Sequence, residues 1–191
     1  MLVKILDTPR RVWLFILLVC VGLLSFGMYL QHVVGLVPCP MCIVQRYAMV
    51  LMGLVALLGT AFPGRKTALI TGSWLVLLAG SGAYVAARQS WLQWYPPEFA
   101  SCGRDFYGMI ETFPLQRAIP MIFKGSGDCT QVDWTFLGGS IANWSFVAFV
   151  GLGLLALATT VRALRPAQGD DHQGDVALSE DDHTAKDVPF L

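Results

Sequence analysis

The residues best suited to chemistry are two cysteines in a C-x-x-C motif, Cys39 and Cys42, at the start of a hydrophobic segment. Two thiols at this spacing open and close a small disulfide ring readily, and a helix N-terminus stabilises the thiolate form. Arg46 follows Cys42 by four residues, one helical turn away on the same face. Its permanent charge would favour a thiolate or an anionic reduced ligand, although anchoring of the helix at lipid headgroups explains it equally well. The motif predicts a reactive dithiol.

Two further cysteines, Cys102 and Cys129, lie 27 residues apart in a glycine-containing stretch. A disulfide between them would close a long loop and add about 3 to 4 kcal/mol of stability in the chain-entropy model. Bracing of this kind is the usual purpose of such a bridge. The nearby C-x-x-C also permits exchange between pairs, because a thiolate attacks a disulfide through a mixed-disulfide intermediate. A four-thiolate zinc site is disfavoured by the spacing, since only one C-x-x-C is present, and we expect no metal.

The remainder of the chain must hold these cysteines at a membrane. Of its 191 residues, 55% are hydrophobic and only 14% are charged, whereas an ordinary soluble domain has roughly 25% charged residues. The apolar residues form four long runs without Asp, Glu, Lys or Arg, each near or above the roughly 20 residues that cross a bilayer as a helix. We expect an all-α membrane protein, an antiparallel bundle of four transmembrane helices in residues 1–165. The helices are expected at about 13–30, 43–62, 68–87 and 144–161, with loops at about 31–42 and 88–143.

The first run could instead belong to a cleaved signal peptide, because Lys4, Arg10 and Arg11 precede it. It is longer than a typical signal-peptide core, however, and no small-residue cleavage site follows it. We therefore interpret it as a retained helix. Cys20 lies near its middle and is expected to be structural, because a thiolate at mid-bilayer depth would be very costly.

Basic residues near the helix ends predict the orientation, because they favour the cytoplasmic side. Seven fall on one side, namely Lys4, Arg10, Arg11, Arg65, Lys66, Arg162 and Arg165. The other side has Arg46 and Arg88 at helix ends and Arg104, Arg117 and Lys124 in the longer loop. Both termini should therefore be cytoplasmic. The two loops, and with them the four cysteines outside the first helix, should face the oxidising periplasm.

Two other segments carry weaker signals. Met109, Ile110 and Phe113 have helical spacing in the second loop, which makes a short interfacial helix a candidate there. Residues 166–191 form an acidic tail with seven Asp or Glu residues and little apolar content, so we expect it to be disordered and cytoplasmic. The formal net charge of zero gives no indication of nucleic-acid binding.

Short segments around the cysteines carry a resemblance to a known family. They are Gln31-His32-Val33, Pro38-Cys39-Pro40-Met41-Cys42-Ile43 with Arg46, Leu92-Gln93-Trp94-Tyr95-Pro96, Phe99-Ala100-Ser101-Cys102, Ser126-Gly127-Asp128-Cys129, Trp134, Phe136-Leu137-Gly138 and Trp144. In their order and in the predicted topology, they resemble the bacterial disulfide bond formation protein B (DsbB) family. The resemblance extends over the chain to about residue 165.

The resemblance implies a thiol:quinone oxidoreductase of the bacterial inner membrane, with redox disulfides Cys39–Cys42 and Cys102–Cys129. In the family, a periplasmic thioredoxin-like oxidant of the DsbA type attacks at the position of Cys102, and Cys129 then attacks Cys39. The released Cys42 thiolate lies against a membrane quinone, either ubiquinone or menaquinone, and Arg46 helps to hold it. The expected partners are therefore a DsbA-type protein, a quinone and the lipid bilayer, with no nucleic acid.

One position departs from the family pattern. Relatives can have a histidine linked to the quinone site, and alignment through Leu92-Gln93-Trp94-Tyr95-Pro96 puts Gln89 at that position. Glutamine donates a hydrogen bond but takes up no proton at neutral pH, so we expect only a quinone contact from Gln89.

Three alternatives remain open from the sequence. A vitamin K epoxide reductase-like protein is disfavoured because its C-x-x-C usually sits late in the bundle, whereas this one precedes the second helix. A paralogue of the DsbB family could serve another dithiol partner. A non-catalytic membrane scaffold could use two disulfides to brace its outer loops.

Overall fold

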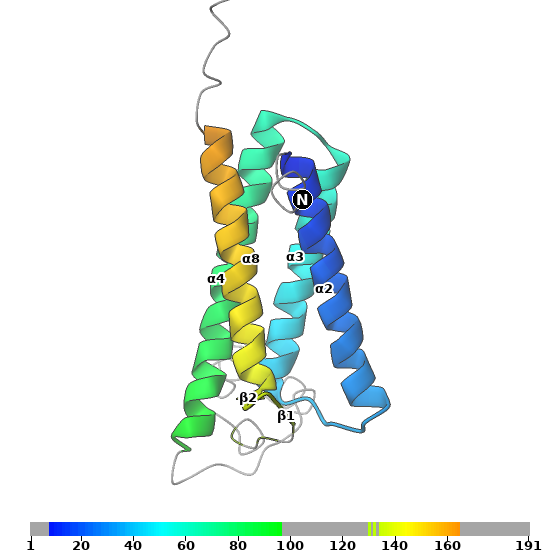
Figure 1. Ribbon diagram of the computed structural model, residues 1–191, viewed down its shortest axis with the longest axis vertical. Helices are drawn as coiled ribbons and strands as arrows, with labels where there is room; N and C mark the ends of the chain where they lie inside the picture. Colours follow the sequence, from blue (N-terminus) through cyan, green and yellow to red (C-terminus); the bar gives the residue numbers. More distant parts are fainter. Residues whose placement is uncertain (1–7, 97–129, 131, 133, 165–191) are drawn as a thin grey trace, which may run out of the picture.

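The computed structural model describes residues 8–96, 130, 132 and 134–164. The elements follow the order α2 (Pro9–His32), α3 (Pro40–Ala61), α4 (Arg65–Trp94), β1 (Thr135–Phe136), β2 (Gly139–Ser140) and α8 (Ile141–Leu164). The four helices run side by side along the longest axis of the molecule (Figure 1). Each is long and apolar enough to cross a membrane. The expected fold, a membrane protein with four spanning helices, is confirmed.

Several helix ends differ from the sequence prediction. The structure starts α3 at Pro40 instead of about residue 43, and it extends α4 to Trp94 instead of about residue 87. The predicted loop therefore begins too early, because residues 88–94 belong to α4. A charged side chain such as Arg88 ends an uncharged run in the sequence, but it does not end a helix. The helix α4 ends at its C-cap Tyr95, because the following Pro96 disfavours helical backbone there. The candidate interfacial helix, the acidic tail, Cys102 and Cys129 lie outside the described residues.

Close contacts between small and large side chains hold the helices together. The helix α4 packs along α8 and α3, and α3 also packs along α2, whereas α2 and α8 contact each other far less. On α4, Gly72 faces Thr160 and Gly82 faces the ring of Phe149, with no room for a Cβ atom at either glycine. Small residues at such positions let helix backbones approach closely in a membrane. The seam between α2 and α8 is the least tightly closed side of the bundle.

This packing makes a testable prediction for Gly82. A methyl group there would overlap the Phe149 ring, so Gly82→Ala should destabilise the bundle by about 1 to 3 kcal/mol, the usual cost of overpacking. Gly80→Ala is the matched control on the same helix, because nothing lies within 4 Å of its added Cβ. Thermal unfolding in detergent should show a lower midpoint for Gly82→Ala alone. Equal midpoints for the two variants would contradict this account of the α4–α8 contact.

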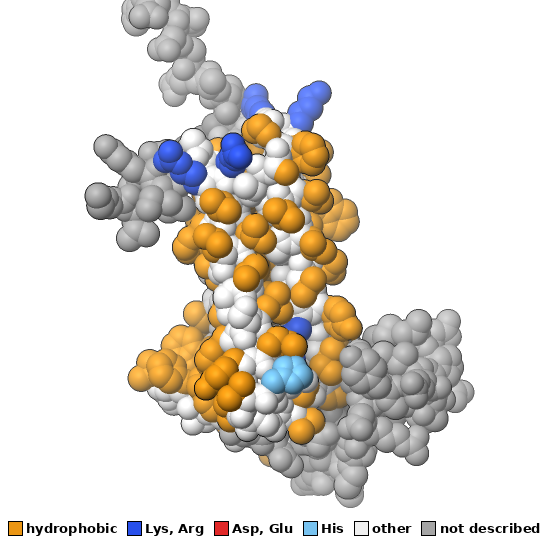
Figure 2. Space-filling view, turned by 90° about the vertical axis from the view of Figure 1, so that its right-hand side faces the viewer, with side chains coloured by type: hydrophobic (Ala, Val, Ile, Leu, Met, Phe, Trp, Pro, Cys, Tyr) orange, Lys and Arg blue, Asp and Glu red, His pale blue; other side chains and the backbone are white. Residues whose placement is uncertain are grey.

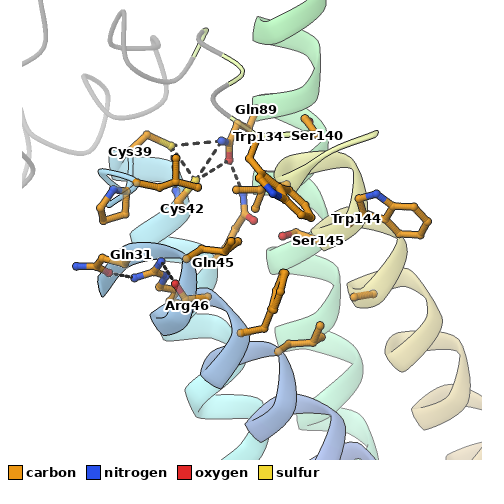
Figure 3. Close-up of a pocket in the computed structure, with 18 of the residues that line it drawn as sticks. Gln31, Cys39, Cys42, Gln45, Arg46, Gln89, Trp134, Ser140, Trp144 and Ser145 are labelled. Carbon is orange, nitrogen blue, oxygen red and sulfur yellow. Dashed lines mark hydrogen bonds between the residues drawn. The ribbon is translucent and has the colours of Figure 1, made fainter. Parts of the chain in front are cut away.

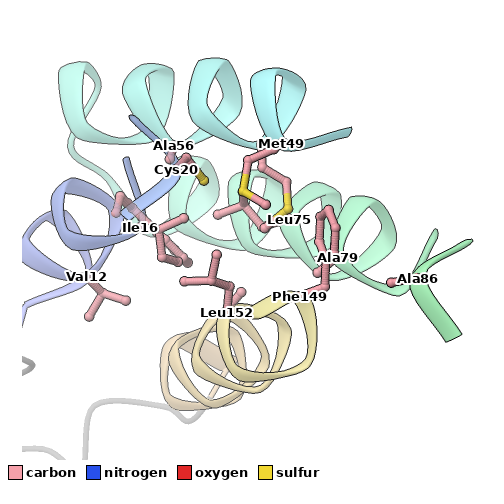
Figure 4. Packing of buried hydrophobic residues seen from close by; sticks show 13 residues of the cluster. Val12, Ile16, Cys20, Met49, Ala56, Leu75, Ala79, Ala86, Phe149 and Leu152 are labelled. Atoms are coloured by element: carbon pink, nitrogen blue, oxygen red, sulfur yellow. The ribbon is translucent and has the colours of Figure 1, made fainter. Parts of the chain in front are cut away.

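The hydrophobic core lies where all four helices meet (Figure 4). Ile16 and Cys20 of α2, Met52 of α3, Leu75 of α4 and Phe149 of α8 are all fully buried in it. Cys20 thus occupies the place of a small apolar residue, in agreement with the structural role expected from the sequence.

The two ends of the bundle differ in charge. Hydrophobic side chains cover much of its height, and Lys and Arg gather at one end (Figure 2). At that end Arg65 donates hydrogen bonds to the carbonyl oxygens of Ala163 (2.9 Å) and Leu164 (3.1 Å), which ties the α3–α4 turn to the end of α8. The described residues include no Asp or Glu. Cys39 and Cys42 lie at the opposite end, where α3 begins.

Candidate active site

The two cysteines of the C-x-x-C motif form the N-terminal end of α3. Cys39 is the N-cap residue, and its sulfur accepts a hydrogen bond from the backbone N–H of Cys42 at 3.4 Å. Pro40 occupies the first helical position, where its fixed φ is suitable and its missing N–H costs nothing. The two sulfur atoms lie 3.0 Å apart. The N–H of Cys42 and the dipole of the helix end therefore favour negative charge on the Cys39 sulfur, and the same dipole acts on the neighbouring Cys42 sulfur.

The residue between the cysteines anchors the motif. Met41 is fully buried and packs with Cys39 against Val85 and Leu92 of α4. Cys39 is 7% exposed, whereas Cys42 is half-buried. The dithiol is thus held against α4 by apolar contacts, and Cys42 is the more accessible of the two.

One buried glutamine contacts the dithiol, and a second buried glutamine bonds to the first (Figure 3). Nε2 of Gln89, on α4, lies 3.3 Å from the sulfur of Cys39 and 3.2 Å from that of Cys42. The Gln89 carbonyl oxygen accepts a hydrogen bond of 2.7 Å from Nε2 of Gln45, on α3. The sequence placed Gln89 after the third helix, but the structure puts it inside α4 and directly against the two sulfurs.

The side chain of Arg46 reaches from α3 across to α2. It donates hydrogen bonds to the side-chain oxygen of Gln31 and to the carbonyl oxygen of Gly27, the second at 3.1 Å. Both partners are neutral, and the described part of the chain offers no carboxylate. The guanidinium is therefore held in place without being neutralised by these contacts, and its charge is available to an electron-rich oxygen.

These groups surround one cavity of about 680 Å³. Cys39, Cys42, Gln45, Arg46 and Gln89 belong to its polar lining, and most of the other lining side chains are apolar. Four further polar residues line it, namely Gln31, Gln93, Ser140 and Ser145. All four helices contribute to the wall, which includes both sides of the poorly closed seam between α2 and α8. Such a volume is typical of a pocket for a small organic molecule.

A series of aromatic side chains crosses the seam beside the cavity. Phe26 of α2 meets Trp134 edge to face at a centroid distance of 5.8 Å, and Trp134 stacks on Phe136 at 6.0 Å. Phe136 in turn lies 6.1 Å from Trp144 of α8. Figure 3 shows Trp134 and Trp144 beside the cavity. The sequence marked three of these residues only as points of family resemblance, so their common location is a result of the structure.

A small hairpin positions this aromatic group. Strands β1 and β2 pair Thr135 with Ser140 and Phe136 with Gly139, which leaves a two-residue turn. Both turn residues, Leu137 (φ 50°) and Gly138 (φ 80°), have positive φ, as the favoured hairpin turn requires. These two short strands are not part of the all-α fold predicted from the sequence.

The hairpin is also tied to its neighbours. Ser140 donates a hydrogen bond to Gln93 of α4 at 2.6 Å, and it accepts one from the backbone N–H of Asn143 at 3.4 Å. The indole N–H of Trp144 donates to the carbonyl oxygen of Phe136 at 2.9 Å. The hairpin therefore joins the start of α8 to the end of α4 beside the cavity.

Comparison with known proteins identifies the family. Residues 9–159 match the family model described as "Disulfide bond formation protein DsbB". The chain belongs to the DsbB family. A relative from Polaromonas naphthalenivorans, named Disulfide bond formation protein B, is 71% identical over 166 residues, which cover 86% of this chain and 99% of that relative. Relatives of the same name from Paracidovorax citrulli and Aromatoleum aromaticum are 64% and 53% identical, covering 84% and 81% of this chain and 92% and 94% of the relatives.

Within this DsbB-family chain, the structure brings together four of the residues singled out from the sequence. Cys39, Cys42, Arg46 and Gln89 line one cavity, whereas the loop pair Cys102 and Cys129 lies outside the described residues. Sequence reasoning missed the roles of other polar residues at this site, namely Gln31, Gln45, Gln93 and Ser140. A usable signal existed for Gln45, because a polar side chain within an apolar membrane helix is costly unless it faces the protein interior.

Proposed function

We propose that this protein is a thiol:quinone oxidoreductase of the bacterial inner membrane. It reoxidises a periplasmic dithiol protein of the DsbA type and passes the electrons to a membrane quinone. The observation that carries the proposal is the position of the Cys42 sulfur, which lines a largely apolar cavity together with Arg46, a cation whose hydrogen-bond partners among the described residues are neutral. Membership of a disulfide bond formation family supports the thiol half of the reaction.

The proposed orientation places both termini in the cytoplasm and the cysteines in the periplasm. It is supported by the basic end of the bundle, where Arg10, Arg65 and Arg162 line a common recess while the cysteines lie at the other end. Positive residues favour the cytoplasmic side. A periplasmic location also gives the cysteines a compartment in which disulfides persist.

The four cysteines then exchange disulfides in sequence. A thiolate of the partner attacks Cys102 and breaks a Cys102–Cys129 disulfide, and the partner's second thiol displaces Cys102 as the partner leaves oxidised. Cys129 attacks Cys39 and breaks the Cys39–Cys42 disulfide, which releases the Cys42 thiolate. Attack of Cys102 on Cys129 restores the loop disulfide and leaves Cys39 and Cys42 as a dithiol. Reoxidation of this dithiol transfers two electrons and two protons to the quinone, which becomes the quinol.

The energetics favour an acceptor of this kind. DsbA is a strong oxidant at about −120 mV, so electrons taken from it require an acceptor that is still more oxidising. Structural disulfides, typically below about −300 mV, do not meet this requirement. A quinone carries two carbonyl oxygens that gain electron density on reduction, and both ubiquinone and menaquinone have this head group on an apolar tail. Arg46 would donate to one of these oxygens, and the apolar wall near the α2–α8 seam would receive the ring and tail.

The test is a reconstituted reaction. Full-length protein in lipid nanodiscs, a reduced DsbA-type protein and either quinone should give many turnovers of quinone reduction, measured by ultraviolet absorbance. A non-catalytic scaffold would keep its disulfides and reduce no quinone, which would overturn the proposal. Turnover with a different thioredoxin-like dithiol but not with DsbA-type proteins would instead identify a paralogue with another partner.

A further inference from the structure

We propose that Gln45 is a positioning residue that orients Gln89 and thereby stabilises the Cys42 thiolate. By donating to the Gln89 carbonyl oxygen, Gln45 holds the amide nitrogen of Gln89 against both sulfurs of the C-x-x-C motif. The role in turnover rests on the proposed function, but the orientation and its effect on ionisation do not require a partner or a quinone.

A count of donors and acceptors supports this orientation. A primary amide has two N–H donors on nitrogen and one carbonyl acceptor. In Gln89, the nitrogen lies 3.3 Å from the Cys39 sulfur and 3.2 Å from the Cys42 sulfur. The oxygen accepts from Gln45 at 2.7 Å and from the Cys42 thiol at the longer distance of 3.7 Å. The nitrogen is therefore the amide atom that lies nearer to the sulfurs, and the shortest bond to the oxygen comes from Gln45. N–H donors facing a sulfur favour its anionic form.

The opposite orientation would have the opposite effect. If the Gln89 amide turned over, its carbonyl oxygen would take the place of the nitrogen, closer to both sulfurs than it lies now, and an acceptor beside a thiolate disfavours the charge. Its nitrogen would then meet the Nε2 donor of Gln45, and two donors cannot bond to each other. The donor on Gln45 is therefore what selects the orientation that suits a thiolate.

Burial makes the selection effective. Gln45 is 5% exposed and Gln89 is 3% exposed, so a lost hydrogen bond is not readily replaced by bulk water. Among the described residues, the charged or titratable side chains that line the cavity are Arg46 and the two cysteines. Neither glutamine carries or exchanges a proton at neutral pH. The amide pair thus stabilises a thiolate without adding a charge or a base.

The test measures alkylation of the reduced C-x-x-C cysteines by iodoacetamide at neutral pH, followed by mass spectrometry of the motif peptide. Gln45→Met and Gln89→Met should each slow the reaction by roughly three- to tenfold, the range that one hydrogen bond implies. The double variant should be no slower than Gln89→Met alone, because Gln45 acts through Gln89. The rates of all variants should converge at alkaline pH, where every thiol is ionised.

Two further variants separate orientation from folding. Gln45→Glu keeps the size of the side chain. When ionised it offers only acceptors to the Gln89 amide and adds a negative charge near the sulfurs, and because both effects disfavour a thiolate it should slow alkylation more than Gln45→Met does. Thr71→Val is the control, since Thr71 is a buried polar side chain of α4 that does not line the cavity, and it should leave the rate unchanged. Additive losses in the double variant, or an unchanged rate in Gln45→Glu, would overturn the proposal even if the protein reduced quinone normally.

Discussion

Replacement of Cys42 by serine should reduce quinone reduction to the uncatalysed background, a loss of at least roughly 10³-fold. A hydroxyl group cannot form the Cys39–Cys42 disulfide, so the dithiol that delivers two electrons no longer exists. The sulfur of Cys42 lines the cavity and is the more accessible of the pair. The measurement is quinone absorbance with reduced DsbA-type protein as the electron donor.

Cys20→Ala is the control for this loss. Cys20 is fully buried in the core formed by all four helices, so its removal should lower stability but preserve turnover per folded molecule. A Cys42→Ser protein that reduced quinone at the parental rate would show that the electrons reach the quinone by another route, and the proposed mechanism would be wrong.

Replacement of Arg46 by methionine is the second change with a large expected effect. A hydrogen bond from a charged donor contributes about 1.5 to 3 kcal/mol, so kcat/KM for the quinone should fall by roughly 10- to 100-fold. The KM for the dithiol partner should change little, because that exchange is proposed to occur at the loop cysteines. Steady-state kinetics with each substrate varied in turn would separate the two effects.

Two control variants test the charge of Arg46 and its position in the cavity separately. Arg46→Lys retains the charge but loses the planar, branched donor that contacts Gln31 and Gly27, so it should recover only part of the activity. Arg88→Met removes an arginine from the same half of the bundle that does not line the cavity, and its kinetics should match those of the parent. If Arg46→Met left the quinone KM and kcat unchanged, anchoring at lipid headgroups would be the better explanation of this arginine.

The position of the cavity predicts the direction from which the lipid-soluble substrate and the dithiol partner would approach. The helices α2 and α8 contact each other far less than the other adjacent pairs, and the aromatic residues Phe26, Trp134, Phe136 and Trp144 cross this seam. A lipid-soluble substrate would therefore meet the cavity from the side of the bundle, through aromatic rings that suit both its head group and its apolar tail. The dithiol partner would approach from the end where α3 begins.

Sequence alone determined the class of this protein and much of its chemistry. Four uncharged apolar runs predict four spanning helices because a bilayer requires every backbone polar group to be paired within the helix. The C-x-x-C and Arg46 follow from local spacing along one helix, and the family follows from short motifs in a particular order.

Only the tertiary structure decided how the site is built. Gln45 and Gln89 are 44 residues apart in the chain, and Arg46 and Gln31 are 15 apart, so their contacts depend on how the helices pack. Periodicity shows which face of a helix is apolar but not which neighbour that face meets. The extension of α4 to Trp94 does not follow from the uncharged run, because Arg88 ends that run without ending the helix. That extension places Gln89 inside the bundle and against the two sulfurs.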